Sequence, residues 1–244
     1  MARGQVRCLR PGLRFLFLVM SAMTMVVGLI GALGQHDLRR VLSFNLVGHI
    51  GFTTVGLALW TPAALGGSIL YMLHHILVIS TLFLISGLFL RQKRTTDMRA
   101  LGGMYRAQPF VACLALVPLF SLAGIPPLSG FIAKLAVVGS MIESRHYFLA
   151  AISLAVSLLT LLSMARVWEE SFWKPAPGQA HVAHPPRLGA AILAPVAFLV
   201  TLTIGLTLAA DPTYRVATTA AQQLLDRDGY VSAVLGNGVL RAAR

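Results

Sequence analysis

The sequence predicts an all-α integral membrane protein, and three observations lead to this fold class. Hydrophobic residues make up 57% of the chain and charged residues only 11%, with a mean hydropathy of +0.77, whereas soluble proteins are about half apolar and about a quarter charged. The apolar residues also come in runs long enough to span a bilayer, which takes about 20 residues per helix. None of these runs alternates with the period of two that a membrane β-strand requires.

Six apolar runs are expected to cross the membrane, so about six transmembrane helices form one domain, residues 15–210. The runs cover residues 15–34, 41–60, 63–90, 109–142, 147–165 and 188–210. A basic segment, residues 1–14, precedes them, and the length of the first run favours a retained helix over a cleaved signal peptide. In the tail, residues 211–244, the pattern predicts an amphipathic helix on the membrane surface or against its neighbours.

The charged residues predict the orientation of the helices. Lys and Arg outnumber Asp and Glu by 20 to 8, mostly in the connections. Basic residues beside membrane spans fix topology and meet anionic lipid, so no nucleic-acid partner is expected. The loops after the first, third and fifth spans hold ten of them, against two in the loops on the opposite side, and are therefore assigned to the cytoplasmic face. Asp37, Arg39 and Arg40 are the charged residues expected at this face. The arginines of residues 1–14 favour the opposite orientation.

The fourth run, residues 109–142, is interrupted at its middle by AGIPPLSG. Gly124, Pro126, Pro127 and Gly130 leave several backbone groups without partners inside a helix. Two half-helices joined inside the membrane are therefore predicted. Such a break is tolerated at membrane depth only where protein or water covers it, which makes it the first functional signal in the chain.

Lys134 lies in the second half-helix, four residues beyond Gly130. A lysine at the bilayer centre costs about 2.5–3.5 kcal/mol, so a functional role is favoured over snorkelling of the side chain to an interface. Because burial disfavours the charged form, such a group can release and recapture a proton. Lys134 is therefore the leading candidate for proton transfer.

Three histidines are further candidates for proton transfer. His74 and His75 are adjacent in the third run, about 100° apart around the helix, so both cannot face one partner. His49 lies in the second run, with Asn45 one turn earlier. A histidine inside a membrane can carry protons or bond neighbouring helices, and both interpretations stay open.

No metal, cofactor or catalytic residue is expected. Two adjacent histidines on one helix chelate a single ion poorly, and no Cys or Glu lies near them in the sequence. Cys8 and Cys113 are far apart and form no metal-binding or disulfide pattern. The chain is accordingly predicted to be a transporter subunit and not an enzyme.

Four segments carry a family resemblance: HDLRRVLSFNLVGHIGF, LYMLHHILVISTLFLISGLF, LAGIPPLSGFIAKL and SLLTLLSMARVWEESFWKPAP. They resemble the last six helices of the D subunit of Mrp-type multisubunit sodium/proton antiporters, which is similar to the proton-pumping membrane subunits of respiratory complex I. The resemblance implies a fourteen-helix fold with two inverted five-helix repeats, of which this chain would hold the second repeat and the final helix.

The resemblance also implies roles for individual residues. Lys134 takes the place of the lysine of the broken helix, and His75 that of the histidine on the preceding helix. Ile79 and Asn45 stand where the pattern of the family has a lysine and a histidine. The lost lysine would interrupt a polar path through the membrane.

These implications lead to a functional expectation with two alternatives. The chain is expected to be a truncated or split membrane subunit of a monovalent cation/proton antiporter in a bacterial inner membrane, contributing a proton half-channel. Its expected partners are other membrane subunits, a separate chain supplying the first repeat, lipid, protons and cations. The alternatives are a proton-pumping subunit of a complex I or hydrogenase-type NADH:quinone oxidoreductase, and a non-transporting structural or degenerate fragment.

Overall fold

The computed structural model describes residues 11–175, 189–226 and 229, and helices account for most of them. In chain order they are α1 (Pro11–Gly34), α2 (Leu38–Leu59), α3 (Pro62–Lys93), α4 (Met104–Ala107), α5 (Pro109–Ala123), α6 (Ser129–Glu143), α7 (Tyr147–Trp168), the π-helical turn η1 (Glu169–Trp173), α8 (Ala190–Leu208) and α9 (Ala210–Leu225). Within these residues, extended pairing is limited to one isolated bridge between Asp37 and Asp97. The all-α fold class is confirmed.

Short connections with defined caps produce the first three helices. The Asp37 carboxylate accepts a hydrogen bond from the Arg40 amide at 3.1 Å and so begins α2. Trp60 ends α2 in the left-handed conformation, at φ 54°. The Thr61 hydroxyl then accepts from the Ala64 amide, and Pro62 fills the first turn of α3, where its missing N–H costs nothing. At each of these two connections the chain therefore reverses direction within a few residues.

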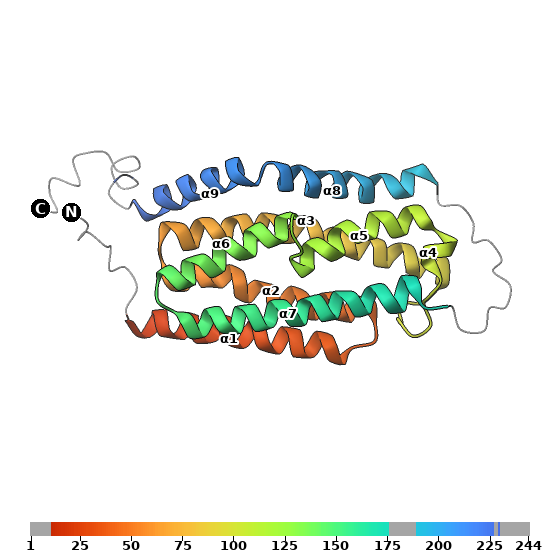
Figure 1. The fold of residues 1–244 in the computed structure, drawn as a ribbon, viewed down its shortest axis with the longest axis horizontal. Helices are drawn as coiled ribbons and strands as arrows, with labels where there is room; N and C mark the ends of the chain where they lie inside the picture. The colour runs from red at the N-terminus through yellow and green to blue at the C-terminus, as the bar shows by residue number, and fades with distance from the viewer. Residues whose placement is uncertain (1–10, 176–188, 227–228, 230–244) are drawn as a thin grey trace, which may run out of the picture.

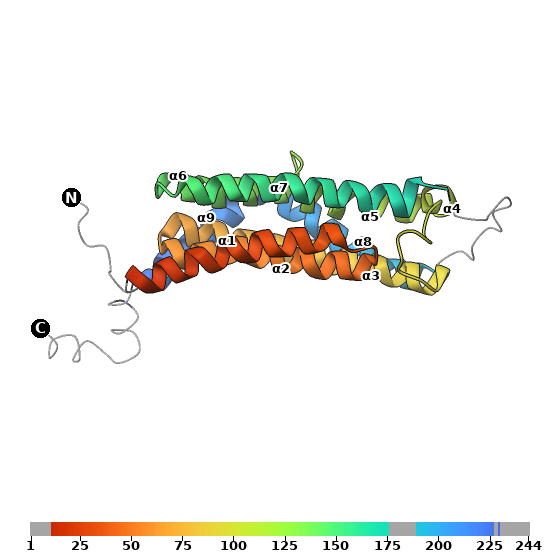
Figure 2. The ribbon, with the colours of Figure 1, turned by 90° about the horizontal axis from the view of Figure 1, so that it is seen from below.

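The helices run side by side along the long axis of the molecule (Figure 1). Seen from below, α1, α2 and α3 lie on one side, and α5, α6 and α7 on the other (Figure 2). Helices α5 and α6 meet end to end near the middle of the bundle, and α8 and α9 follow one another along α3. The middle of the bundle therefore contains two helix junctions.

Five of the described helical segments are long and apolar enough to cross a membrane: Gly12–Gly34, Leu38–Leu59, Pro62–Lys93, Tyr147–Trp173 and Ala190–Leu208. Helix α5 is apolar but shorter, and residues 124–128 separate it from α6. That α5 and α6 together make a sixth span, broken inside the membrane, stays a prediction.

Helix α9 is amphipathic and packs lengthwise against α3. Its buried face consists of Ala210, Ala217 and Ala221, while Arg215 and Thr219 are exposed. The contact is close because a Cβ added to Gly66 of α3 would lie 2.7 Å from the Thr218 hydroxyl. Of the amphipathic tail expected from the sequence, this part lies against a neighbouring helix. Most residues beyond Asp226, like residues 1–10, lie outside the described part.

Candidate functional site

Lys134 is buried in the middle of the bundle, at the junction of α5 and α6. Its side chain is 6% exposed, and its Nζ donates to the carbonyl oxygens of Leu122 and Ala123, both at 3.1 Å. These carbonyls belong to the last turn of α5, where no further amide of that helix can reach them. The negative end of the helix dipole also lies there and favours a cation. The lysine of one half-helix therefore caps the other.

The backbone N–H groups of residues 124–129 all have hydrogen-bond acceptors. The amides of Gly124 and Ile125 donate back to Phe120, and the Leu128 amide donates to Ile125. The Ser129 amide donates to the Thr207 hydroxyl of α8 at 3.0 Å. Pro126 and Pro127 have no N–H, so they add no unpaired donor. The junction thus meets the main requirement for an interrupted helix at membrane depth.

Two glycines allow the half-helices to approach each other. Gly124 ends α5 with φ 84°, a conformation that favours glycine. At Gly130, an added Cβ would collide with the Ser121 carbonyl oxygen and would lie 2.9 Å from His74 Nε2. Gly130 therefore places α6 directly against the end of α5 and against the histidine pair.

His49 and His75 face each other beside a tyrosine. The centroids of their rings are 4.9 Å apart, and the Tyr71 hydroxyl is hydrogen-bonded to His49 Nδ1. The Tyr71 ring stacks parallel to His75, with an interplanar angle of 5°. Phe52 lies next to this group, its ring centroid 6.0 Å from Lys134 Nζ. His49 of α2 with Tyr71 and His75 of α3 thus form a buried row of titratable side chains beside Lys134.

His74 points to a different set of partners, as the 100° offset from His75 requires. Its Nδ1 lies 3.0 Å from the Ser129 hydroxyl, which is 3.2 Å from the Ser121 hydroxyl. Both serines lie at the α5–α6 junction, and the Ser129 amide also binds Thr207 of α8. The two adjacent histidines therefore face different polar neighbours, while the Tyr71 ring lies close to both, with its centroid 6.0 Å from that of His74.

The polar chain continues from His49 toward the end of the bundle where α2 begins. Asn45 Nδ2 donates to Val41 O at 2.9 Å and to the Ser163 hydroxyl of α7 at 3.3 Å. Asn45 Oδ1 and the Nε2 atoms of all three histidines are buried and have no partner among the described residues. Buried polar atoms in this situation are the usual positions for bridging water. On α3, the position one turn after His75 is the buried, apolar Ile79.

The charged residues expected at the cytoplasmic end lie at the start of α2. Asp37 caps α2 and accepts from the Thr96 hydroxyl at 2.5 Å. Arg39 Nε reaches the Ser86 hydroxyl of α3 at 3.4 Å, and Arg40 is exposed. Asp37 therefore acts locally as a helix cap, while Arg39 spans α2 and α3 at the end of the polar interior.

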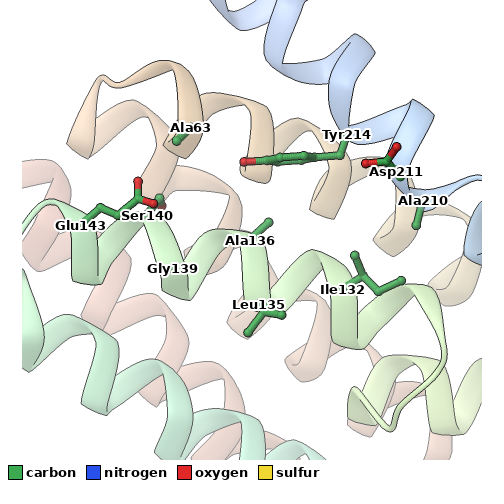
Figure 3. A pocket seen from close by; sticks show the side chains of 10 residues that line it. All are labelled: Ala63, Ile132, Leu135, Ala136, Gly139, Ser140, Glu143, Ala210, Asp211 and Tyr214. Carbon is green, nitrogen blue, oxygen red and sulfur yellow. The ribbon is translucent and has the colours of Figure 1, made fainter.

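A pocket of about 420 Å³ lies apart from these buried polar residues, between α6, the beginning of α3 and the beginning of α9 (Figure 3). Small and apolar residues such as Ala63, Ala136 and Ala210 line most of it. Glu143 and Asp211 lie toward its two ends, with Tyr214 facing it from α9. None of the candidate proton-transfer residues lines it, so the pocket is separate from the polar interior.

The candidate proton-transfer residues proposed from the sequence are thus brought together, and the structure adds the hydroxyl groups of Tyr71, Ser121 and Ser129. Lys134 and His49 both lie beside the Phe52 ring, and His75 packs against His49. His74 lies beside the α5–α6 junction. Sequence reasoning missed Tyr71, although it lies four residues before His75, the spacing of neighbours on one helix face. No cluster of metal-binding side chains occurs within the described part of the chain.

Apolar helices around a buried lysine and three buried histidines define a membrane protein with an ionisable interior. The chain belongs to the family described as "NADH:quinone oxidoreductase/Mrp antiporter, TM", whose model matches residues 6–160. The resemblance inferred from the four sequence segments is confirmed.

Individual relatives agree with this assignment. The chain is 38% identical over 221 residues to the Na⁺/H⁺ antiporter D subunit of Alkalihalophilus pseudofirmus, a match that covers 90% of this chain and 44% of that protein. It matches a chain in the Mrp complex from Dietzia sp. DQ12-45-1b with a TM-score of 0.84 and 30% identity, over 91% of this chain and 49% of the other.

A more distant likeness concerns the fold alone. A chain of respiratory complex I from Thermus thermophilus matches with a TM-score of 0.72 and 21% identity, over 86% of this chain and 44% of that one. The chain spans about half the length of the relatives that it matches.

Proposed function

We propose that this chain is a truncated or split membrane subunit of a multisubunit monovalent cation/proton antiporter, contributing a proton half-channel. One observation carries the proposal: Lys134 is buried against the carbonyl oxygens at the end of α5 and beside two chains of polar groups. The kinship with a Na⁺/H⁺ antiporter D subunit supports this interpretation, and it gives a role to a lysine that would otherwise cost insertion energy.

In this proposal, Lys134 alternates between its charged and neutral forms. The ammonium is stabilised by the two carbonyls and by the dipole of α5. A cation arriving nearby, or loss of water around the site, favours release of the proton. Two routes then lead away from Lys134: one through His75, Tyr71 and His49 toward Asn45, and one through His74 and the serines of the junction. Arg39 and Arg40, in the first turn of α2, place positive charge at the cytoplasmic end of the first route.

The proposal includes partners and a location. The chain spans about half the length of its relatives. In the proposal, other membrane subunits complete the complex, one of them a separate chain that carries the first repeat. The assembly would lie in a bacterial inner membrane and exchange protons for monovalent cations.

Two alternatives rest on specific observations. The family description includes NADH:quinone oxidoreductases, so the chain could serve a proton-pumping complex coupled to electron transfer. Neighbouring genes for small antiporter subunits favour the antiporter, and genes for flavin and iron–sulfur subunits favour the oxidoreductase. The apolar Ile79 after His75 supports the other alternative, a structural element without transport. That alternative requires the complex to tolerate neutral substitution of Lys134.

The experiment for this proposal measures cation-induced proton flux in inverted vesicles from an antiporter-deficient, salt-sensitive host. The chain is expressed alone and together with candidate partner subunits. Flux that requires the partners is expected for a split antiporter subunit. If no combination produces flux above the empty host, the antiporter proposal fails in favour of the structural alternative.

A further inference from the structure

Two arginines converge on one histidine at the end of the bundle where α2 begins. His36 lies in the turn between α1 and α2. Its Nδ1 is 2.6 Å from Arg166 Nη2 of α7, and its Nε2 is 2.6 Å from Arg99 Nη2 in the loop after α3. Arg166 also donates to Leu33 O at 2.7 Å. The three side chains come from three segments that are far apart in the sequence.

One imidazole cannot satisfy both arginines. A guanidinium only donates hydrogen bonds, and a neutral imidazole has one acceptor nitrogen and one N–H. One guanidinium therefore faces a donor and needs a further acceptor. Arg166 already has the Leu33 carbonyl, whereas for Arg99 the described residues provide the histidine ring alone.

Nearby carboxylates do not compensate this positive charge. Asp37 accepts from the Arg40 amide and the Thr96 hydroxyl, and Asp97 accepts from the Arg99 amide. In the described part of the chain, the ion pairs are Lys174–Glu170 and Arg215–Asp211, and neither includes Arg99 or Arg166. Among these residues, the two guanidiniums on His36 thus lack a paired counter-charge.

The backbone fixes this cluster in place. The Leu38 amide donates to Thr96 O and the Met98 amide donates to His36 O, both at 2.9 Å. These bonds join the α1–α2 turn to the loop that carries Arg99. Both segments lie at the ends of apolar helices, where lipid phosphates would meet the protein.

We propose that Arg99, Arg166 and His36 form a binding site for a phosphate oxyanion. A phosphate offers several acceptor oxygens, so it can bind both guanidiniums at once and leave the ring one partner. Its charge would offset theirs and tie the α1–α2 turn, the loop after α3 and α7 together. The phosphate belongs to an anionic lipid headgroup or to free phosphate, and the proposal is independent of the transport function.

The test measures the thermal unfolding midpoint, Tm, of the purified full chain in phosphatidylcholine nanodiscs. In one arm, phosphatidylglycerol is included in the nanodisc lipid. In the other arm, inorganic phosphate is added to the buffer and compared with chloride at equal ionic strength. Because a ligand that binds the folded state raises Tm, a saturable rise is expected in at least one arm. A rise with the lipid alone identifies a headgroup site, and a rise with inorganic phosphate identifies a free-anion site.

The variants are Arg99→Gln and Arg91→Gln. Both side chains are exposed and both changes remove one positive charge at the same end of the bundle, but Arg91 lies in the last turn of α3. Arg99→Gln is expected to lose the rise in Tm and Arg91→Gln to keep it. Equal responses of the two variants, or no rise in the unsubstituted chain, would overturn the proposal. Native mass spectrometry of the lipid retained by each variant provides a second readout that does not depend on Tm.

Discussion

Lys134 Nζ lies 3.1 Å from two carbonyl oxygens that end α5, so the side chain has polar partners inside an apolar bundle. A lysine without such partners would cost about 2.5–3.5 kcal/mol at the bilayer centre. Hydrogen bonds to a charged group contribute about 1.5–3 kcal/mol each, which offsets much of this cost. The charged form of Lys134 is therefore tolerated inside the bundle.

For a single side chain, we predict that Tyr71→Phe reduces cation-induced proton flux several-fold in an active complex. The change removes only the hydroxyl bonded to His49 and keeps the ring stacked on His75. The fold should persist because the rest of the buried side chain is unchanged. Tyr214→Phe, in the separate pocket on α9, is the matched control. Equal flux in the two variants would remove Tyr71 from the proton route.

Single residues also show what the sequence could predict about the site. Lys134 and the histidines stand out in the sequence because placing an ionisable side chain inside an apolar run costs free energy of membrane insertion. Tyr71, Ser121 and Ser129 carry no such cost, since neutral hydroxyls are common in membrane helices. Their part in the site depends on the close approach of α2, α3, α5 and α6, which no local pattern encodes.

Among the helices, the α5–α6 junction depends on the small volume of Gly130. Gly130→Ala is expected to destabilise the protein by about 1–3 kcal/mol, the usual cost of overpacking, because its Cβ would collide with the Ser121 carbonyl. Thermal unfolding in detergent measures the effect. Gly139→Ala is the control on the same helix, since a Cβ there meets nothing within 4 Å. A loss of stability equal to that of the control would contradict this packing.

The docking of α9 on α3 gives a second prediction about helix packing. Gly66→Ile should displace α9, because even a Cβ at Gly66 would come within 2.7 Å of Thr218. Faster proteolysis within α9 is the expected readout. Gly87→Ile lies on the same helix where a Cβ has open space, and it should leave the cleavage rate unchanged. Unchanged cleavage in Gly66→Ile would show that α9 does not need this contact.

The helix boundaries were more predictable than the helix contacts. The run 147–165 lies within α7, Tyr147–Trp168, and the run 109–142 corresponds to two helices, Pro109–Ala123 and Ser129–Glu143. Hydropathy and the glycine and proline residues of the break carry this information locally. The sequence could not show whether α9 lies on the membrane surface or against a neighbouring helix, because either location buries the apolar face of an amphipathic helix.

Across the whole molecule, the arrangement of polarity is that of a membrane protein. Large apolar side chains such as Phe15, Leu158 and Phe198 are exposed, while several polar or ionisable side chains are buried, namely those of Lys134, Asn45, His49, His74 and His75. The exposed apolar faces suit lipid or a neighbouring membrane subunit. Because the chain spans about half of its relatives, transport by the whole assembly is the appropriate readout of its interior.

Cation-dependent proton flux in the assembled complex carrying Lys134→Ala is the measurement that bears most closely on the proposed proton carrier. We predict loss of flux in this variant, whereas Lys174→Ala, which removes an exposed surface lysine, should retain it. Complex assembly is checked in parallel by co-purification, so that lost flux can be separated from lost subunits. An assembled complex with unchanged flux would contradict the assignment of Lys134 as the proton-carrying group.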